Sequence, residues 1–126
     1  MGCTTSQVNI VNSIDLTDYN FATLIDVMSY GGSTNLMNLE VEIYNALSTT
    51  RLSLIGDREI NSLTADQRQQ LLLVRFSANQ NSTGSTIAIN FVEYSTGRPV
   101  ASFIGTSELG FSAAINAVAG KMRGVF

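Results

Sequence analysis

The stretch Thr86–Thr106, TIAINFVEYSTGRPVASFIGT, decides the fold class of this chain. Apolar residues alternate with small or polar residues on both sides of Ser95–Arg98, which is the pattern of half-buried β-strands. Gly97 lies within these four polar residues and can adopt the positive φ that a tight turn requires. The stretch therefore predicts an antiparallel hairpin with strands over 86–94 and 99–106.

Working outward, the flanking segments complete an α+β pattern. Three further strands are predicted over 19–30, 51–56 and 71–79, because apolar residues alternate there or fill both faces. Two helices are predicted, over 35–47 and 107–123, from apolar residues three and four apart. The first helix lies between two strands, as in a βαβ crossover. The order β-α-β-β-β-β-α predicts a two-layer sandwich, in which a mostly antiparallel sheet carries two helices on one face.

Each helix shows a distinct apolar stripe. In the first helix the stripe consists of Leu36, Leu39, Ile43 and Leu47, and we expect Met37, Val41 and Tyr44 to widen it. In the last helix it consists of Phe111, Ile115, Val118 and Met122, with Ala114 and Ala117 beside it. Since alanines occupy little space, the last helix is expected to pack close to the sheet.

The chain has 126 residues, enough for one domain with its own core. Residues 1–18 are polar and irregular, and we predict a lipidated tether there that leads into an edge strand near Val8–Ile14. Residues 19–126 are predicted to form a single α+β domain.

The composition excludes several classes of function. The formal net charge is −3, whereas nucleic-acid binding needs a basic surface, so no nucleic-acid partner is expected. The chain has no histidine and one cysteine. Ser-His-Asp and Cys-His catalysis are therefore excluded, because both need a histidine. Zinc sites built from cysteine and histidine are excluded for the same reason. We predict no catalytic residues, no metal site and no cofactor, and no apolar run approaches the roughly 20 residues of a membrane-spanning helix.

The single cysteine, Cys3, is the one candidate modification site. It follows Gly2, as the lipid-bearing cysteine of a bacterial lipoprotein follows a small residue, and this is the favoured interpretation. Under this interpretation, the gene encodes a signal segment upstream and the mature protein lacks residues 1–2. The stretch MGCTTS also fits eukaryotic myristoylation of Gly2 with palmitate on Cys3. A cysteine without any role is the third alternative.

Carboxylates give an alternative function, a small hydrolase that works through two acids alone. Glu40 and Glu42 are two residues apart on a helix and therefore point in different directions. Asp57 and Glu59 lie in a polar stretch that is typical of a solvated loop. We predict that none of these pairs is catalytic.

Three remaining motifs and the four tyrosines are interpreted without a functional role. Asp26 interrupts an apolar strand and is expected to pair with Arg75 or to face water at the end of the strand. Gly31–Thr34 precedes a helix without the lysine of a phosphate-binding loop, which favours a turn and helix cap. Asn81–Thr83 fits a glycosylation acceptor, interpreted as coincidence in a bacterial protein. The four tyrosines, Tyr19, Tyr30, Tyr44 and Tyr94, are expected at the edge of the core.

With these elements in place, the chain resembles small bacterial envelope lipoproteins of a domain-of-unknown-function family. The likeness is carried by Gly2-Cys3, Ile14–Tyr19, the Glu93–Val100 hairpin and the closing Phe111–Phe126 helix. The topology is also similar to lipoproteins that assist curli secretion or activate cell-wall synthases. The resemblance implies an envelope location and a lipid on Cys3, and it implies no catalytic residues.

Together these observations predict a non-enzymatic lipoprotein that is held in the cell envelope, on its periplasmic or surface side, by a lipid on Cys3. Its domain is expected to act as a binding or assembly module for an envelope protein partner, with contact through a sheet edge or the polar sheet face. The carboxylate-dependent periplasmic hydrolase remains the alternative.

Overall fold

The predicted hairpin is present in the computed structural model, which describes residues 4–10, 18–24, 34–81 and 84–126. Strands β5 (Gly84–Glu93) and β6 (Pro99–Ser107) pair antiparallel. The turn between them passes through Gly97 at φ 74°, a value that glycine adopts without steric cost. The pairing shifts register between Phe91 and Val92, where β6 begins.

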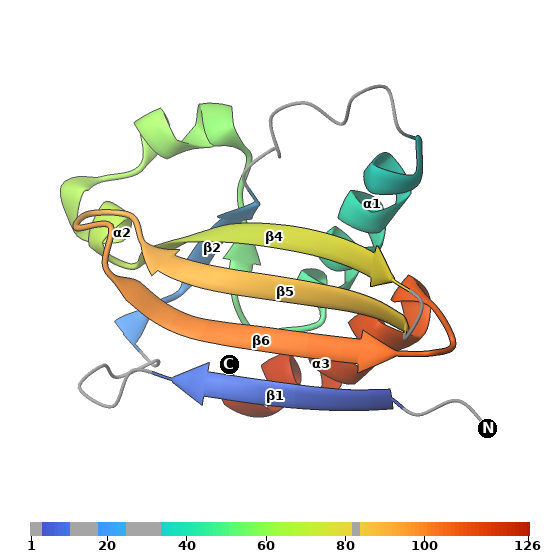
Figure 1. The fold of residues 1–126 in the computed structure, drawn as a ribbon. Coiled ribbons are helices and arrows are strands. Elements are labelled where there is room, and N and C mark those ends of the chain that lie inside the picture. Colours follow the sequence, from blue (N-terminus) through green and yellow to red (C-terminus); the bar gives the residue numbers. More distant parts are fainter. Residues whose placement is uncertain (1–3, 11–17, 25–33, 82–83) are drawn as a thin grey trace.

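The hairpin lies within a six-stranded sheet of order β1-β6-β5-β4-β2-β3 (Figure 1). Its other strands are β1 (Thr4–Ile10), β2 (Phe21–Leu24), β3 (Ser53–Leu54) and β4 (Leu71–Asn81). The pairs β1–β6, β6–β5 and β5–β4 are antiparallel, and β2 lies parallel to both β4 and β3. The mostly antiparallel sheet and the parallel crossover through helix α1 (Thr34–Ser48) are therefore confirmed.

Helices α1 and α3 (Phe111–Val125) cover one face of the sheet, as predicted. The apolar stripes supply Leu39, Ile43 and Leu47 from α1, and Ile115, Val118 and Met122 from α3, all buried. They pack on the inner side chains of the central strands, among them Ile87, Ile89, Phe91 and Phe103.

The approach of α3 to β6 is very close at Gly105. A Cβ atom built there would lie 2.5 Å from the backbone oxygen of Ala114 and 2.6 Å from Cγ2 of Val118. No side chain can occupy this position without moving the helix. The absence of a side chain at Gly105 therefore allows this close approach of the two layers.

Between β3 and β4 the chain forms two short helices, η2 (Asp57–Ser62) and α2 (Ala65–Gln69). Helix α2 begins with a capping box at Thr64. Thr64 accepts a hydrogen bond from the Gln67 backbone N–H, while the Gln67 side chain accepts one from the Thr64 backbone N–H. This reciprocal pair satisfies two of the amide groups that a helix N-terminus leaves free.

The structure differs from the sequence predictions in four places. The strand predicted over 51–56 is reduced to the two residues of β3. The edge strand expected near Val8–Ile14 begins at Thr4 as β1, so residues 4–7, assigned to the tether, belong to the sheet, and residues 11–14 lie outside the described part of the chain. Helix α3 begins at Phe111 rather than near Ser107, because β6 continues to Ser107 and Gly110 turns the chain at φ 117°. Val41 and Tyr44 do not widen the α1 stripe.

These two side chains are 59% and 48% exposed respectively. Val41 is two residues from both Leu39 and Ile43, which at about 100° per residue puts it on the opposite side of the helix.

Several sequence predictions fall outside the described residues, wholly or in part: those for Cys3, Asp26, Tyr30, Gly31–Thr34 and Asn81–Thr83.

Candidate functional site

None of the described helices covers the opposite face of the sheet along strands β4, β5, β6 and β1 (Figure 1). Strand register assigns its residues, since directly paired residues point to the same side of a sheet. The outward residues are Leu73, Arg75, Ser77 and Asn79 of β4; Thr86, Ala88, Asn90 and Val92 of β5; Ser102, Ile104 and Thr106 of β6; and Thr5, Gln7 and Asn9 of β1. Among these residues only Arg75 carries a charge. We call this surface the open face.

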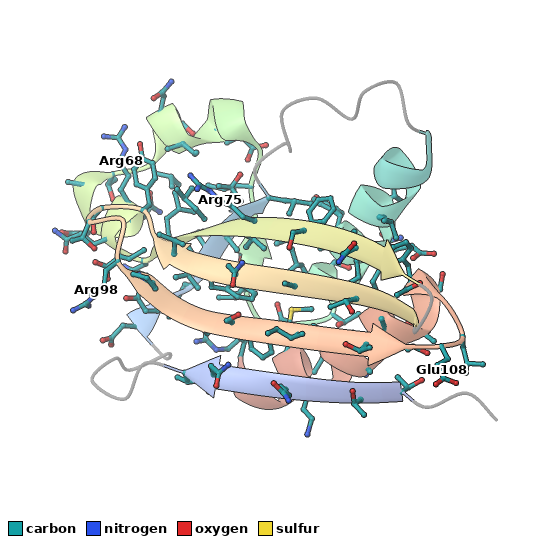
Figure 2. All side chains as sticks on the ribbon, in the orientation of Figure 1. Arg68, Arg75, Arg98 and Glu108 are labelled. Carbon is teal, nitrogen blue, oxygen red and sulfur yellow. The ribbon has the colours of Figure 1, made fainter. Side chains whose placement is uncertain are left out.

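One end of the open face is hollowed, with a cavity of about 510 Å³. Its lining includes Asn9, Ile10, Arg75, Asn90 and Ser102. The Ser102 hydroxyl donates to Asn90 Oδ1 over 2.8 Å, so these two side chains are already partnered. Arg75 is exposed and extends from the sheet (Figure 2). Asp26, expected to pair with it, lies outside the described residues. The hollow offers amide, hydroxyl and apolar groups beside one cation.

The free edge of strand β1 adjoins the open face. Within the described residues β1 pairs with β6 alone. Its sequence, TTSQVNI, has no charge and no proline, and its pairing with β6 shows no register shift. Natural edge strands usually carry lysine, proline or a bulge, which discourage pairing with a second chain. This edge lacks all three devices.

At the end of the sheet where β5 turns into β6, five side chains form a compact clamp. The Tyr19 hydroxyl donates to Glu93 Oε2 over 2.5 Å. Thr96 donates to Glu93 Oε1 over 2.7 Å, Ser95 donates to it over 3.3 Å, and Arg98 Nη2 lies 3.7 Å from Oε2. The clamp joins Tyr19, two residues before β2, to the hairpin 74 positions later.

The electrostatics of this clamp favour a carboxylate facing a neutral phenol. Burial, and then the hydrogen bond to Glu93, raise the pKa of Tyr19 to about 12. The hydrogen bonds from Thr96 and Tyr19 lower the pKa of Glu93. Because the Glu93 oxygens already accept several hydrogen bonds, this carboxylate holds the hairpin in place and is poorly suited to act as a base.

A second, smaller hollow of about 310 Å³ lies between α1 and α3. Glu42 Oε1 accepts a hydrogen bond of 2.8 Å from Ser112, while its Oε2 is buried without a partner in the described part of the chain. At the other end of this hollow the Arg123 guanidinium donates to Thr49 Oγ1 over 3.5 Å. These contacts join the two helices.

The carboxylates considered from sequence are spread over the molecule. Glu42 faces α3 and Glu59 is exposed in η2, whereas the side chains of Glu40 and Asp57 lie outside the described residues. Of the two hollows, the larger has no carboxylate in its lining and the smaller has Glu42 alone. The described residues also contain no group of three His, Cys, Asp or Glu side chains placed to hold a metal ion.

No helix among the described residues is both long and apolar enough to cross a membrane. Sequence reasoning found neither the large hollow nor the clamp. Both depend on contacts between distant residues, and the only local signal is the run of Glu93, Ser95 and Thr96, three polar side chains beside a turn.

No family model and no curated protein matches the sequence. Among solved structures, a PelC dodecamer from Paraburkholderia phytofirmans is similar with a TM-score of 0.56 and 12% identity, over 98% of this chain and 97% of that chain. A variant of that dodecamer gives a TM-score of 0.53 and 14% identity, over 99% and 98%.

A PDZ domain protein from Parabacteroides distasonis is similar with a TM-score of 0.57 and 8% identity, over 98% of this chain but 35% of that chain. At these identities the three structures show that the same fold occurs elsewhere, and they say nothing of activity.

Proposed function

We propose that this protein is a lipid-anchored component of a bacterial cell envelope, with the lipid on Cys3, and that its domain is a binding or assembly module. The Gly2-Cys3 pair supports the anchor, because a small residue precedes the cysteine as in bacterial lipoproteins. Two or three acyl chains hold a protein on a membrane firmly, since each buried CH₂ contributes about 0.8 kcal/mol.

The observation that carries the assembly role is the free edge of β1 beside the open face. Along the seven residues of β1, the backbone N–H and C=O groups that point away from β6, about half of the total, are available to a second strand. The partner that these features support best is a second copy of this chain, since β1 of one copy can pair antiparallel with β1 of another and continue the sheet. The similar PelC structures are dodecamers, which also supports association between copies.

A binding module is better supported than the carboxylate-dependent hydrolase. Such a hydrolase needs two carboxyl groups that face one substrate, about 5–10 Å apart. The linings of the two hollows contain one carboxylate between them, Glu42, and one of its oxygens already accepts a hydrogen bond from Ser112.

The anchor is tested by the intact mass of the N-terminal peptide from protein purified from its native source. We expect a diacylglycerol thioether on Cys3 and the loss of residues 1–2. Myristate on Gly2 would move the protein to another compartment, and an unmodified N-terminus would leave Cys3 without a role. Either result contradicts the anchored envelope protein.

The assembly role is tested by light scattering on the purified domain across a concentration series. We expect the wild-type protein to form dimers or larger assemblies and Gln7→Lys to shift them to monomers, because an exposed lysine on the edge opposes pairing. Ser48→Lys, at an exposed position of α1, is the matched control and should leave the assembly unchanged. A wild-type protein that stays monomeric throughout would show that β1 does not pair with a second copy.

A further inference from the structure

One buried serine ties the start of the first strand to the turn that follows β6. The hydroxyl oxygens of Thr4 and Ser107 lie 2.8 Å apart in a hydrogen bond, and the backbone N–H of Leu109 donates to the same Ser107 oxygen over 3.0 Å. Thr4 and Ser107 are also direct partners in the β1–β6 register. The turn over 108–110 is therefore fixed beside the residue with which β1 begins.

This turn presents an apolar side chain that nothing in the described structure covers. Leu109 is 70% exposed, more than the other exposed large hydrophobic residues of the described part of the chain. Gly110 follows it at φ 117°, so the chain reverses there into α3. The neighbouring Glu108, also exposed, marks this end of the sheet in Figure 2, beside the N-terminal end of β1.

The lipid-bearing residue proposed above leads directly into this end of the sheet. Cys3 immediately precedes Thr4, and consecutive Cα atoms are about 3.8 Å apart, so no spacer separates the acyl chains from the domain. A lipid on Cys3 would hold the Leu109 turn at the membrane surface. An exposed leucine suits the boundary between headgroups and acyl chains, whereas in water it is unfavourable.

We propose that the turn formed by Glu108, Leu109 and Gly110 is a membrane-contacting element, with Leu109 inserted into the bilayer interface next to the lipid on Cys3. This inference rests on the proposed lipid anchor. It orients the domain with this end of the sheet on the bilayer and the β5–β6 turn pointing away. The carboxylate of Glu108 stays among the headgroups, and since the turn has no basic residue, contact does not require anionic lipid.

The chain is well suited to a direct test, because it contains no tryptophan and one cysteine. A maleimide lipid can be coupled to Cys3 alone, and Leu109→Trp introduces a single fluorescent indole. The probe is a vesicle of phosphatidylcholine and phosphatidylethanolamine, with or without bromine on the acyl chains. Tyr94→Trp is the matched control, because Tyr94 is 38% exposed and lies at the opposite end of the sheet. The distance along the chain from Gly84 to Tyr94 is about 34 Å, at ~3.4 Å per residue.

On vesicles we expect the Leu109→Trp indole to shift its emission to shorter wavelength and to lose intensity when the acyl chains are brominated. The Tyr94→Trp indole should do neither. Circular dichroism checks that both variants keep the wild-type spectrum. Adding the anionic lipid phosphatidylglycerol to the vesicles should leave the difference in emission and quenching between the two indoles unchanged.

The possible failures are distinguishable. If the lipid-coupled protein sediments with vesicles but neither indole is quenched, or both are quenched alike, the end-on contact is overturned while the anchor stands. If the N-terminal peptide from the native source carries no lipid on Cys3, the proposed function is overturned and this inference with it.

Discussion

Replacing Gly105 by alanine should destabilise the domain far more than an exchange of one hydrogen for a methyl group suggests. The new Cβ would lie 2.5 Å from the Ala114 backbone oxygen and 2.6 Å from Cγ2 of Val118. Both distances are about 1 Å shorter than an ordinary van der Waals contact of ~3.5 Å. The Ala114 oxygen belongs to the helix backbone and cannot turn aside as a flexible side chain would.

The substitution therefore forces α3 away from β6 by close to 1 Å, and the core contacts of Val118 and Met122 loosen with it. Overpacking of this kind costs typically about 1–3 kcal/mol. At about 2 kcal/mol, and with a midpoint shift of roughly 3–6 °C per kcal/mol for a domain of this size, the midpoint of thermal unfolding should fall by roughly 6–12 °C.

Thermal and urea unfolding, followed by circular dichroism, measure this loss. The matched control is Gly124→Ala in α3, where a Cβ would meet nothing within 4 Å. It should leave the midpoint of unfolding unchanged or raise it slightly, because alanine has the higher helix propensity but Gly124 lies in the last turn of α3. If Gly105→Ala unfolds at the wild-type midpoint, α3 does not pack on β6 as closely as described.

Three further predictions concern the clamp and the contacts of the Phe126 ring with Phe91 and Phe103. Tyr19→Phe removes the hydroxyl that donates to Glu93 and should cost about 1.5 kcal/mol in urea unfolding; an unchanged free energy of unfolding would show that the contact is not formed. Because the pKa of Glu93 is lowered in the folded protein, this group stabilises the fold above pH 4.5, its unfolded pKa, and the stabilisation is lost as the pH falls through the folded pKa. Because the pKa of Tyr19 is raised, this group stabilises the fold below pH 10, and that stabilisation is lost as the pH rises toward 12. Glu93→Gln should therefore flatten the acid side of the stability profile, and a profile identical to wild type would contradict this. Phe126→Ala should cost about 2 kcal/mol in thermal unfolding, because the Phe126 ring centroid lies 4.9 Å from that of Phe91 and 6.2 Å from that of Phe103; no change would mean that this ring does not pack.

Most of the fold could be predicted from sequence because its signals are local. The alternation in β4, β5 and β6, the turn at Gly97 and the three- and four-residue spacing in α3 each involve neighbours in the chain. The parallel crossover through α1 also followed from the order of its elements. Ends of elements were less well predicted, since β6 extends to Ser107 by pairing both with β5 and with β1, a strand more than ninety residues away.

The beginning of strand β1 shows why other features escaped sequence analysis. An edge strand was expected only from Val8, because residues 4–7, TTSQ, are all polar and nothing in them distinguishes a strand from a tether. The segment becomes a strand because β6 offers a free edge and because Val8 packs on the core. The clamp of Tyr19 on Glu93 and the bridge of Ser107 to Thr4 likewise connect residues 74 and 103 positions apart.

The proposed anchor and the proposed assembly reinforce each other through geometry. With the Leu109 end of the sheet on the bilayer, β1 starts at the membrane at Thr4 and runs away from it toward Ile10. Its free edge then stands along the membrane normal, where neighbouring anchored copies can reach it by sliding in the plane of the bilayer. Confinement to that plane raises the local concentration of copies, so the same contact along the seven-residue strand should form at a lower total concentration on the membrane than in solution. Association of the lipid-coupled protein on vesicles should accordingly occur at a lower total concentration than association of the uncoupled domain in solution, and Gln7→Lys should abolish that advantage without releasing the protein from the vesicles.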